Sequence, residues 1–297
     1  MFKDNLIQKT CDKFSNIGIA KKILSHYVTE YIEENLQRCQ DLNFANMYPW
    51  QELQLPKNYF LQKIINYKGV TYLTGARYIS KDITKPFIEL LATSSVQMDI
   101  SQDVKEILIE DWKEIKPLFI RNLISSDKVH ADIDQEIWAA NLQEMQSKTS
   151  ITDLSIKLAK PEHLSFLLDA LYKAYANIAN ADNMSLSPAT ADDIPDWVNK
   201  KQLYILCYLD TKVGFIACEE KRVGFMNGLY VAEEVILPEF QGRRFASLMQ
   251  MMLAQKLSLH YSPDTLFYGT ILFNNIASKR SAMHAGRKNI LQYEKIY

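Results

Sequence analysis

The stretch ILPEFQGRRFASLMQ, residues Ile236–Gln250, combines the end of an apolar strand, a turn with one glycine and two arginines, and an amphipathic helix. A helix that begins directly after a strand leaves its first amides without intrahelical partners, and these donors favour an anion. Gly242 lacks a Cβ that would keep a ligand from the backbone, and Arg243 and Arg244 add positive charge. The stretch therefore predicts a phosphate site, against the plainer alternative of an ordinary glycine turn with solvated arginines.

The sequence around this turn predicts alternating strands and helices. Pro161 stands where the first turn of a helix tolerates proline, and the helix after Gly242 buries apolar residues at helical spacing. The predicted elements are the strand Leu154–Leu158, helices after Pro161 and at Asp192–Asn199, the strands Leu203–Leu209, Val213–Cys218 and Gly228–Leu237, the helix after Gly242, the strand Thr265–Leu272, the helix Ile276–Ala285 and the strand Asn289–Ile296.

The first half of the sequence also mixes helix and strand patterns. The helix Ala20–Leu36, the paired strands Val70–Ile79 and Phe87–Ala92, and the helix Val104–Ile115 are predicted. This half shows no glycine-rich turn, metal-ligand spacing or paired catalytic residues. Because residues 146–150 are small and polar, we expect a domain boundary there, with an α/β or α+β companion domain at 1–147 and a second domain at 151–297.

Composition limits the classes of partner. The chain has 297 residues, and Lys+Arg 34 against Asp+Glu 35 gives a net charge of -1, so no overall basic field favours nucleic acid or an anionic membrane. The apolar runs are far shorter than the ~20 residues that span a bilayer, and the N-terminus lacks a signal-peptide core. We expect a cytoplasmic protein. The four cysteines form no CxxC pair, which favours free, buried thiols over zinc or disulfides.

Two motifs resemble those of the GNAT acetyltransferase superfamily. The acetyl-CoA motif of that family reads Gln/Arg-x-x-Gly-x-Gly/Ala, and it corresponds here to Gln241–Ala246, with Arg244 in place of the inner glycine. The family also has Asn-x-x-Ser at the start of a later helix, with a glycine eight residues beyond the serine. Asn275, Ser278 and Gly286 stand at that spacing. Both motifs lie between residues 151 and 297, on the elements expected for the family.

The resemblance implies a mixed, mostly antiparallel sheet flanked by helices, which splits after its fourth strand. It implies acetyl-CoA as cosubstrate and no metal, with the pantetheine arm in the split. The cofactor-binding residues that follow are Val235, Ile236 and Leu237 on the strand, Gln241, Gly242, Arg243, Arg244, Phe245 and Ala246 at the turn, and Asn275 and Ser278 on the later helix. The first half is either a companion that shapes the acceptor site or a degenerate copy of the same fold.

Acetyl transfer to an amine requires a proton acceptor, and the strand before the turn offers two glutamates. Side chains alternate along a strand, so Glu233 and Glu234 should face opposite sides, with Glu234 on the face of Tyr230, Ala232 and Ile236. In the family that face looks toward the substrate, which makes Glu234 the first candidate for the general base and Glu233 the second. Equally, one of them could anchor a cationic substrate or pair with an arginine.

The proton donor for the departing thiolate is less defined. The position of the usual family tyrosine, seven residues after the motif asparagine, holds Ala282. Tyr293, Tyr268 and Ser281 are alternatives, and direct attack without an acid is also compatible with a thiolate leaving group.

The sequence thus predicts an N-acetyltransferase that moves an acetyl group from acetyl-CoA to an amino group of a small amine, peptide or protein, as a monomer or homodimer. Arg244 and Ala282 keep a second hypothesis open, a catalytically impaired acyl-CoA-binding regulatory or interaction protein. A third is a structural α/β module with an incidental glycine turn. The polar loop Ala179–Ala191, expected near the acceptor, does not specify the acceptor.

Overall fold

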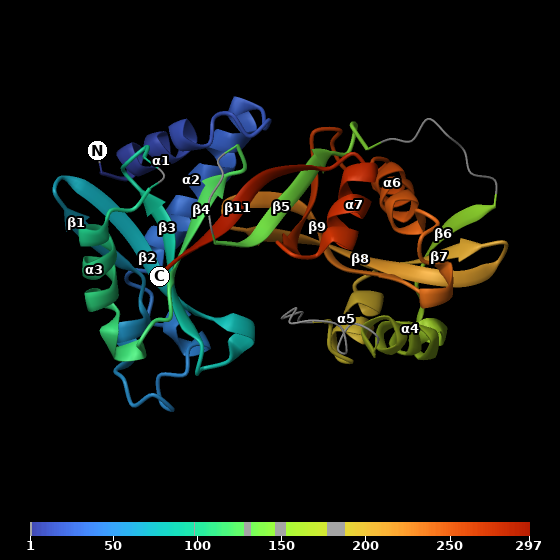
Figure 1. Ribbon diagram of the computed structural model, residues 1–297, viewed down its shortest axis with the longest axis horizontal. Coiled ribbons are helices and arrows are strands. Elements are labelled where there is room, and N and C mark those ends of the chain that lie inside the picture. Colours follow the sequence, from blue (N-terminus) through green and yellow to red (C-terminus); the bar gives the residue numbers. More distant parts are fainter. Residues whose placement is uncertain (1, 98, 128–131, 146–152, 177–187) are drawn as a thin grey trace. The chain divides into compact units, whose positions relative to one another are not determined.

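The computed structural model describes residues 2–97, 99–127, 132–145, 153–176 and 188–297, which form two compact units (Figure 1). Unit 1 comprises Met1–Gln135, Val223–Met226 and Ile290–Tyr297, and unit 2 comprises Glu136–Arg222 and Asn227–Asn289. The predicted boundary at residues 146–150 lies outside the described residues. A division at residues 146–150 would place residues 136–145 in the first domain and residues 290–297 in the second. In the structure, residues 136–145 belong to unit 2 and residues 290–297 to unit 1.

Unit 1 is a mixed sheet with helices. Its strand order is β1-β2-β3-β4-β11, with β3 and β4 parallel and the β1–β2, β2–β3 and β4–β11 pairs antiparallel. The predicted helix at 20–36 and the predicted strand pair at 70–79 and 87–92 are confirmed. The elements are α1 Phe2–Lys13, α2 Lys21–Gln37, β1 Lys63–Tyr67, β2 Val70–Tyr78, β3 Pro86–Thr93, α3 Gln102–Asp111, β4 Ile120–Ser125, the first residues of β5 Ile133–Asn141 and most of β11 Lys288–Ile296.

One hydrophobic cluster of unit 1 lies between the sheet and α3. Trp112, just beyond α3, is fully buried and donates from Nε1 to Thr74 Oγ1 at 3.0 Å. Val104 and Leu108 of α3 pack in the same cluster as Ile88 of β3. Unit 1 therefore has a hydrophobic core of its own.

Unit 2 holds both motifs. In its sheet, β6, β7 and β8 pair antiparallel in sequence order, and β9 and β10 pair in parallel. All of the strands and helices predicted here are present, with ends shifted by a few residues. They are β6 Leu154–Leu158, α4 Leu164–Ala176, α5 Asp193–Asn199, β7 Leu203–Tyr208, β8 Thr211–Val223, β9 Met226–Ile236, α6 Phe245–Leu257, β10 Leu266–Leu272 and α7 Ile276–His284.

Helices cover both faces of this sheet. Figure 1 shows α6 and α7 on one side of β8 and β9, and α4 and α5 on the other. Met249 and Leu253 of α6 are fully buried in the first layer, whereas Leu167 of α4 and Trp197 of α5 lie in the second. The sheet is thus buried on both faces, which explains the near-continuous apolar sequence of β7.

The side chains of β9 alternate between these two layers except at one point. Leu229 and Ile236 both pack in the α6 layer, although strict alternation would put them on opposite faces. Ala232 packs in the α4–α5 layer, and the adjacent Glu233 bonds to Tyr175 of α4. Two consecutive residues therefore face one layer, as they do at a β-bulge.

Two further sequence expectations can be compared with the structure. The four cysteines are free thiols, and Cys207 and Cys218 are buried, but the prediction of burial is wrong for Cys11 on α1 and Cys39 just after α2, which are partly exposed. Among the described helices, none combines the length and apolar character needed to cross a bilayer.

Candidate functional site

The turn between β9 and α6 has an unusual backbone. A single turn of 3-10 helix, Pro238–Phe240, follows β9 and leads to Gly242, whose φ is +76°. A Cβ placed on Gly242 would meet no atom within 4 Å, so the approach to its backbone is open. Arg244 also adopts a left-handed conformation, with φ of 62°, and forms the N-cap of α6. This is the position where the GNAT motif has its inner glycine, and the positive φ explains that preference.

The amides of this turn are unused donors. In the described part of the chain, the N–H groups from Gly242 through Ser247 have no backbone or side-chain acceptor, and the first helical bond to the cap joins Leu248 N–H to the Arg244 carbonyl at 3.1 Å. A run of N–H groups at a turn with positive φ angles forms an anion-binding concavity, and the dipole of α6 adds to its positive potential. The predicted phosphate site is therefore geometrically available.

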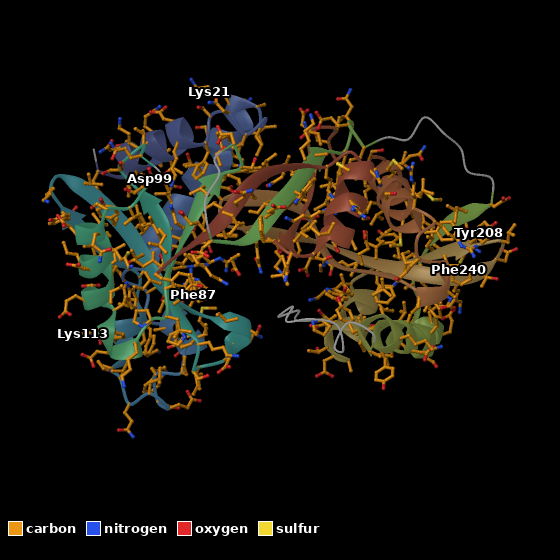
Figure 2. All side chains as sticks on the ribbon, in the orientation of Figure 1. Lys21, Phe87, Asp99, Lys113, Tyr208 and Phe240 are labelled. Carbon is orange, nitrogen blue, oxygen red and sulfur yellow. The ribbon has the colours of Figure 1, made fainter. Side chains whose placement is uncertain are left out.

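Aromatic packing fixes the turn on unit 2. Phe245, the first residue of α6, contacts Tyr208 of β7 with ring centroids 5.2 Å apart and stacks with Phe240 at 6.5 Å. Figure 2 shows Tyr208 and Phe240 at the same end of this unit. The exposed Arg243 guanidinium lies 5.5 Å from the centroid of Phe240. Anchored rings hold the amides in position, while Arg243 and Arg244 extend into solvent.

Strands β9 and β10 part beside this turn. Their ladder consists of Leu229 with Phe267 and Tyr230 with Tyr268. No further pair joins the two strands in the described residues, although β9 continues to Ile236. The parallel strands thus meet at one end and separate toward the end that carries the turn, as the resemblance implied.

The backbone groups of Val235, Ile236 and Leu237, which the resemblance assigns to the cofactor, do not all point to the same side of the strand. Leu237 N–H donates to the Val213 carbonyl of β8 at 2.9 Å, and the Val235 carbonyl lies 2.3 Å from where a Cβ on Gly214 of β8 would stand. Backbone groups alternate along a strand, so Ile236 directs its own toward the side that β10 has left. Of the three, Ile236 presents its backbone to the gap, and its carbonyl accepts a bond from Gln241 Nε2 at 3.1 Å.

The second motif behaves as a helix cap. Asn275 is the N-cap of α7, and its side chain accepts from Ser278 N–H at 3.1 Å. Gly286, with φ of +95°, ends the same helix. These contacts are structural, and they fix the end of α7 that follows β10.

Glu233 is a buried carboxylate in the α4–α5 layer. Its Oε1 accepts from Tyr175 Oη at 2.8 Å and from the Glu234 N–H at 3.1 Å, and its Oε2 accepts from Ala189 N–H at 3.0 Å. Burial raises the pKa of Glu233 despite these three donors. A carboxyl with a raised pKa, bonded to a partly exposed phenol, can take up a proton and exchange it through the tyrosine.

Glu234 lies in the opposite layer, within a polar cluster. Gln250 Nε2 of α6 donates to its Oε2 at 2.5 Å, and Ser281 Oγ of α7 donates to its Oε1 at 3.0 Å. Burial raises the pKa of Glu234, and the charge of Arg287 acts against that shift. Glu234 shares this layer with Ile236, but the expectation that it also shares a face with Ala232 is wrong, because the irregularity in β9 lies between them.

The candidates for the proton donor belong to different elements. Tyr293 is buried in unit 1, where the Arg121 guanidinium lies 3.8 Å from its ring centroid. The Tyr268 hydroxyl donates to the Lys221 carbonyl at 2.6 Å. Ala282 is a fully buried residue of α7, and the adjacent Ser281 donates to Glu234.

Sequence reasoning missed three residues near the glutamates. Tyr175 has the helical spacing of a core residue, and nothing in its local sequence links it to a strand 58 positions later. Gln250 and Arg287 are polar residues in an apolar layer of unit 2. The sequence contains one signal for this cluster, because Gln250 is a polar residue among the apolar residues of α6, and a buried glutamine needs hydrogen-bonding partners. Among the described residues, no group of histidine, cysteine or carboxylate side chains is arranged to hold a metal ion.

Comparison with solved structures identifies the fold. A GCN5-related N-acetyltransferase from Sphaerobacter thermophilus superposes with a TM-score of 0.50, covering 76% of this chain and 80% of that one at 9% identity. The fold is that of the GNAT acetyltransferases. At this identity the likeness to GNAT proteins concerns the fold alone. No family model and no curated protein matches the sequence.

Other GNAT structures are similar over long stretches. An acetyltransferase of the GNAT family from Colwellia psychrerythraea covers 75% of this chain and 85% of its own, with 14% identity and a TM-score of 0.47. A GCN5-related N-acetyltransferase from Kribbella flavida covers 86% and 95%, with 9% identity and a TM-score of 0.44.

Proposed function

We propose that the protein is an acyltransferase that binds a coenzyme A thioester in unit 2 and transfers its acyl group, acetyl in the simplest case, to an amine. The observation that carries this proposal is the run of unused amides from Gly242 to Ser247 at the open end of the β9–β10 split. Diphosphate oxygens fit such a run of donors, and the extended pantetheine arm fits beside the Ile236 backbone.

The proposed roles follow from the two layers. The amine nitrogen attacks the thioester carbonyl, the carbon–sulfur bond breaks, and the nitrogen loses a proton while the thiolate gains one. Glu233 is the proposed proton acceptor, because it bonds to the partly exposed Tyr175, which can relay the proton. Glu234, preferred from the sequence, is bonded to Gln250 and Ser281 and is assigned to the support of β9 instead.

A pair of glycines provides a matched test of the diphosphate site. Gly242 and Gly69 have nearly equal φ angles, +76° and +78°, and a Cβ on either would meet no atom within 4 Å. Replacing either by alanine should therefore cost a similar ~1 kcal/mol of stability from backbone strain. Because the new methyl group of Gly242→Ala stands where the ligand approaches, that variant alone should bind coenzyme A about tenfold more weakly, measured by calorimetry.

Two outcomes would count against the proposal. If wild-type protein shows no binding at millimolar acetyl-CoA, or if both alanine variants bind coenzyme A as the wild type does, the amides do not hold the diphosphate. Tight binding without any thiol release against amino acids, polyamines and lysine peptides would favour the second function, an acyl-CoA-binding protein. The buried Ala282, where the family has its tyrosine, supports that candidate.

A further inference from the structure

Arg287 is a buried cation without a hydrogen-bonding partner. Its side chain is 4% exposed, and in the described part of the chain its Nε and Nη1 donate to no acceptor. The backbone fixes its position, because Arg287 N–H donates to the Ala282 carbonyl at 2.9 Å directly after the glycine that ends α7. Buried guanidinium groups are normally paired, since leaving water with unmet donors is costly.

The carboxylate that acts most strongly on Arg287 does not pair with it. Glu234 is the carboxylate that interacts most strongly with Arg287, yet no ion pair or hydrogen bond joins them among the described residues. Both Glu234 oxygens are already bound, one by Gln250 and one by Ser281. Burial lowers the pKa of Arg287 to about 10, so the group stays charged at neutral pH. The Phe267 ring, whose centroid lies 5.9 Å from the Arg287 Cζ, accepts none of its hydrogen bonds, whereas an anion would supply the acceptors that these donors lack.

The polar cluster around Glu234 also contains a hydrogen-bond acceptor that no donor reaches, Gln250 Oε1, in the described residues. Gln250 is fully buried, its Nε2 donates to Glu234, and its Oε1 has no hydrogen-bonding partner in the described residues. Unused donors and an unused acceptor thus lie in one buried layer, between α6 and α7. A dry apolar core would contain neither, which points to a polar group that enters from outside.

Arg287 lies where the two strands part. Its Nη1 is 3.1 Å from the position of a Cβ on Gly269, a position that is also 3.4 Å from the Val231 carbonyl. Gly269 and Val231 are the first residues beyond the Tyr268–Tyr230 pair that closes the ladder. The guanidinium therefore stands at the closed end of the split, and the unused amides stand at its open end.

A thioester bound as proposed above would bring its acyl group to this closed end, because the acyl group is the part furthest from the diphosphate. We propose that Arg287 binds a carboxylate carried by the acyl group, so that the preferred donor is a carboxyacyl-CoA of the malonyl or succinyl type. This inference rests on the proposed function and specifies its donor. The Glu234–Gln250–Ser281 cluster holds the arginine's surroundings in place and offers Gln250 Oε1 to a bound water or protonated group.

The test compares donors that differ in one charge. Calorimetry on the full chain, without acceptor, measures affinities for coenzyme A, acetyl-CoA, acetoacetyl-CoA, malonyl-CoA and succinyl-CoA. Acetoacetyl-CoA matches malonyl-CoA in shape but lacks the carboxylate. We expect malonyl-CoA or succinyl-CoA to bind at least about tenfold more tightly than acetoacetyl-CoA, as a bond to a charged group provides.

Two variants test whether Arg287 causes the preference for a carboxyacyl-CoA. Arg287→Met should abolish the preference while leaving affinity for coenzyme A unchanged, and Lys288→Met, which removes the same charge from the adjacent exposed position, should keep it. Equal affinities for all acyl forms in the wild type, with coenzyme A still bound, would overturn this inference and leave the proposed function intact. Absence of coenzyme A binding would overturn both. If Arg287→Met fails to fold, the wild-type comparison decides.

Discussion

Arg244 holds the least favourable backbone conformation at the candidate site. A left-handed φ of 62° costs a residue with a Cβ ~1–2 kcal/mol, whereas glycine adopts it freely. We predict that Arg244→Gly is more stable than Arg244→Ala by about 1 kcal/mol in urea unfolding, because both remove the same charge. Arg243 has no positive φ, so there the order should reverse, with alanine the more stable. Equal stability of the two Arg244 variants would contradict the assigned strain.

Glu233 and Glu234 are adjacent in sequence and differ in their neighbours. If Glu233 is the proton acceptor, Glu233→Gln should lower turnover by ~10²–10⁴-fold with coenzyme A affinity preserved. Glu234→Gln should lower it less than about tenfold, because its neighbours Gln250 and Ser281 can rearrange to bond an amide. Thiol release from acetyl-CoA with an amine panel measures both. The reverse order of effects would return the role to Glu234.

At the scale of elements, the sequence predicts every strand and helix of unit 2 from β6 to α7, but it misses β5 and the irregularity in β9. Period-two alternation is readable, and so Gly228–Leu237 was assigned as a strand. A bulge leaves no periodic signal, however, because Ala232 and Glu233 are both compatible with either face. The bulge also explains why Glu234 was wrongly expected on the face of Ala232, since one extra residue reverses the layer of every side chain beyond it.

The Glu234 cluster joins three elements, β9, α6 and α7, and should make stability depend on pH. The pKa of Glu234 is raised above its ordinary value of 4.5, so the folded state binds more protons than the unfolded state above that pH. Stability should therefore fall as pH rises from 4.5 through the folded-state pKa. The expected loss is ~1.4 kcal/mol for each pH unit that separates the folded-state pKa from the unfolded-state pKa.

The variant Glu234→Gln, which resembles the protonated form, should lose less stability with rising pH, because only the contribution of Glu233, whose pKa is also raised, remains. Urea unfolding midpoints between acid and neutral pH compare it with the wild type, and the exposed Glu239→Gln serves as control for loss of one charge. If the stability of the wild type and of Glu234→Gln changes with pH in the same way, the pKa of Glu234 is not raised in the folded state.

For the whole molecule, the local patterns that predicted the elements could not predict the two units. β11 was recognised as the closing strand of the second half, but its residues Leu291–Ile296 pair with Ile120–Ser125 in unit 1. Which edge a strand joins depends on contacts distant in sequence, and a single sequence carries no record of them. The same holds for residues 136–145, which belong to unit 2.

Removal of residues 290–297 should accordingly destabilise unit 1. Leu291 and Tyr293 are buried there, and losing their burial costs ~3–6 kcal/mol. Hydrogen exchange of the amides in β4 measures the effect, and we expect their protection to be lost. Deletion of the exposed Tyr297 alone should leave it unchanged. Retained protection in the longer deletion would mean that β4 is stable without its partner.

Because β11 pairs with β4, the sheet of unit 1 is completed only by the last residues of the sequence. During synthesis the β1–β4 part of unit 1 is made before unit 2, whereas residues 290–297, which complete its sheet, are translated after every residue of unit 2. Until then β4 lacks the strand that pairs with it, and an unpaired strand edge is a surface that chaperones protect from aggregation.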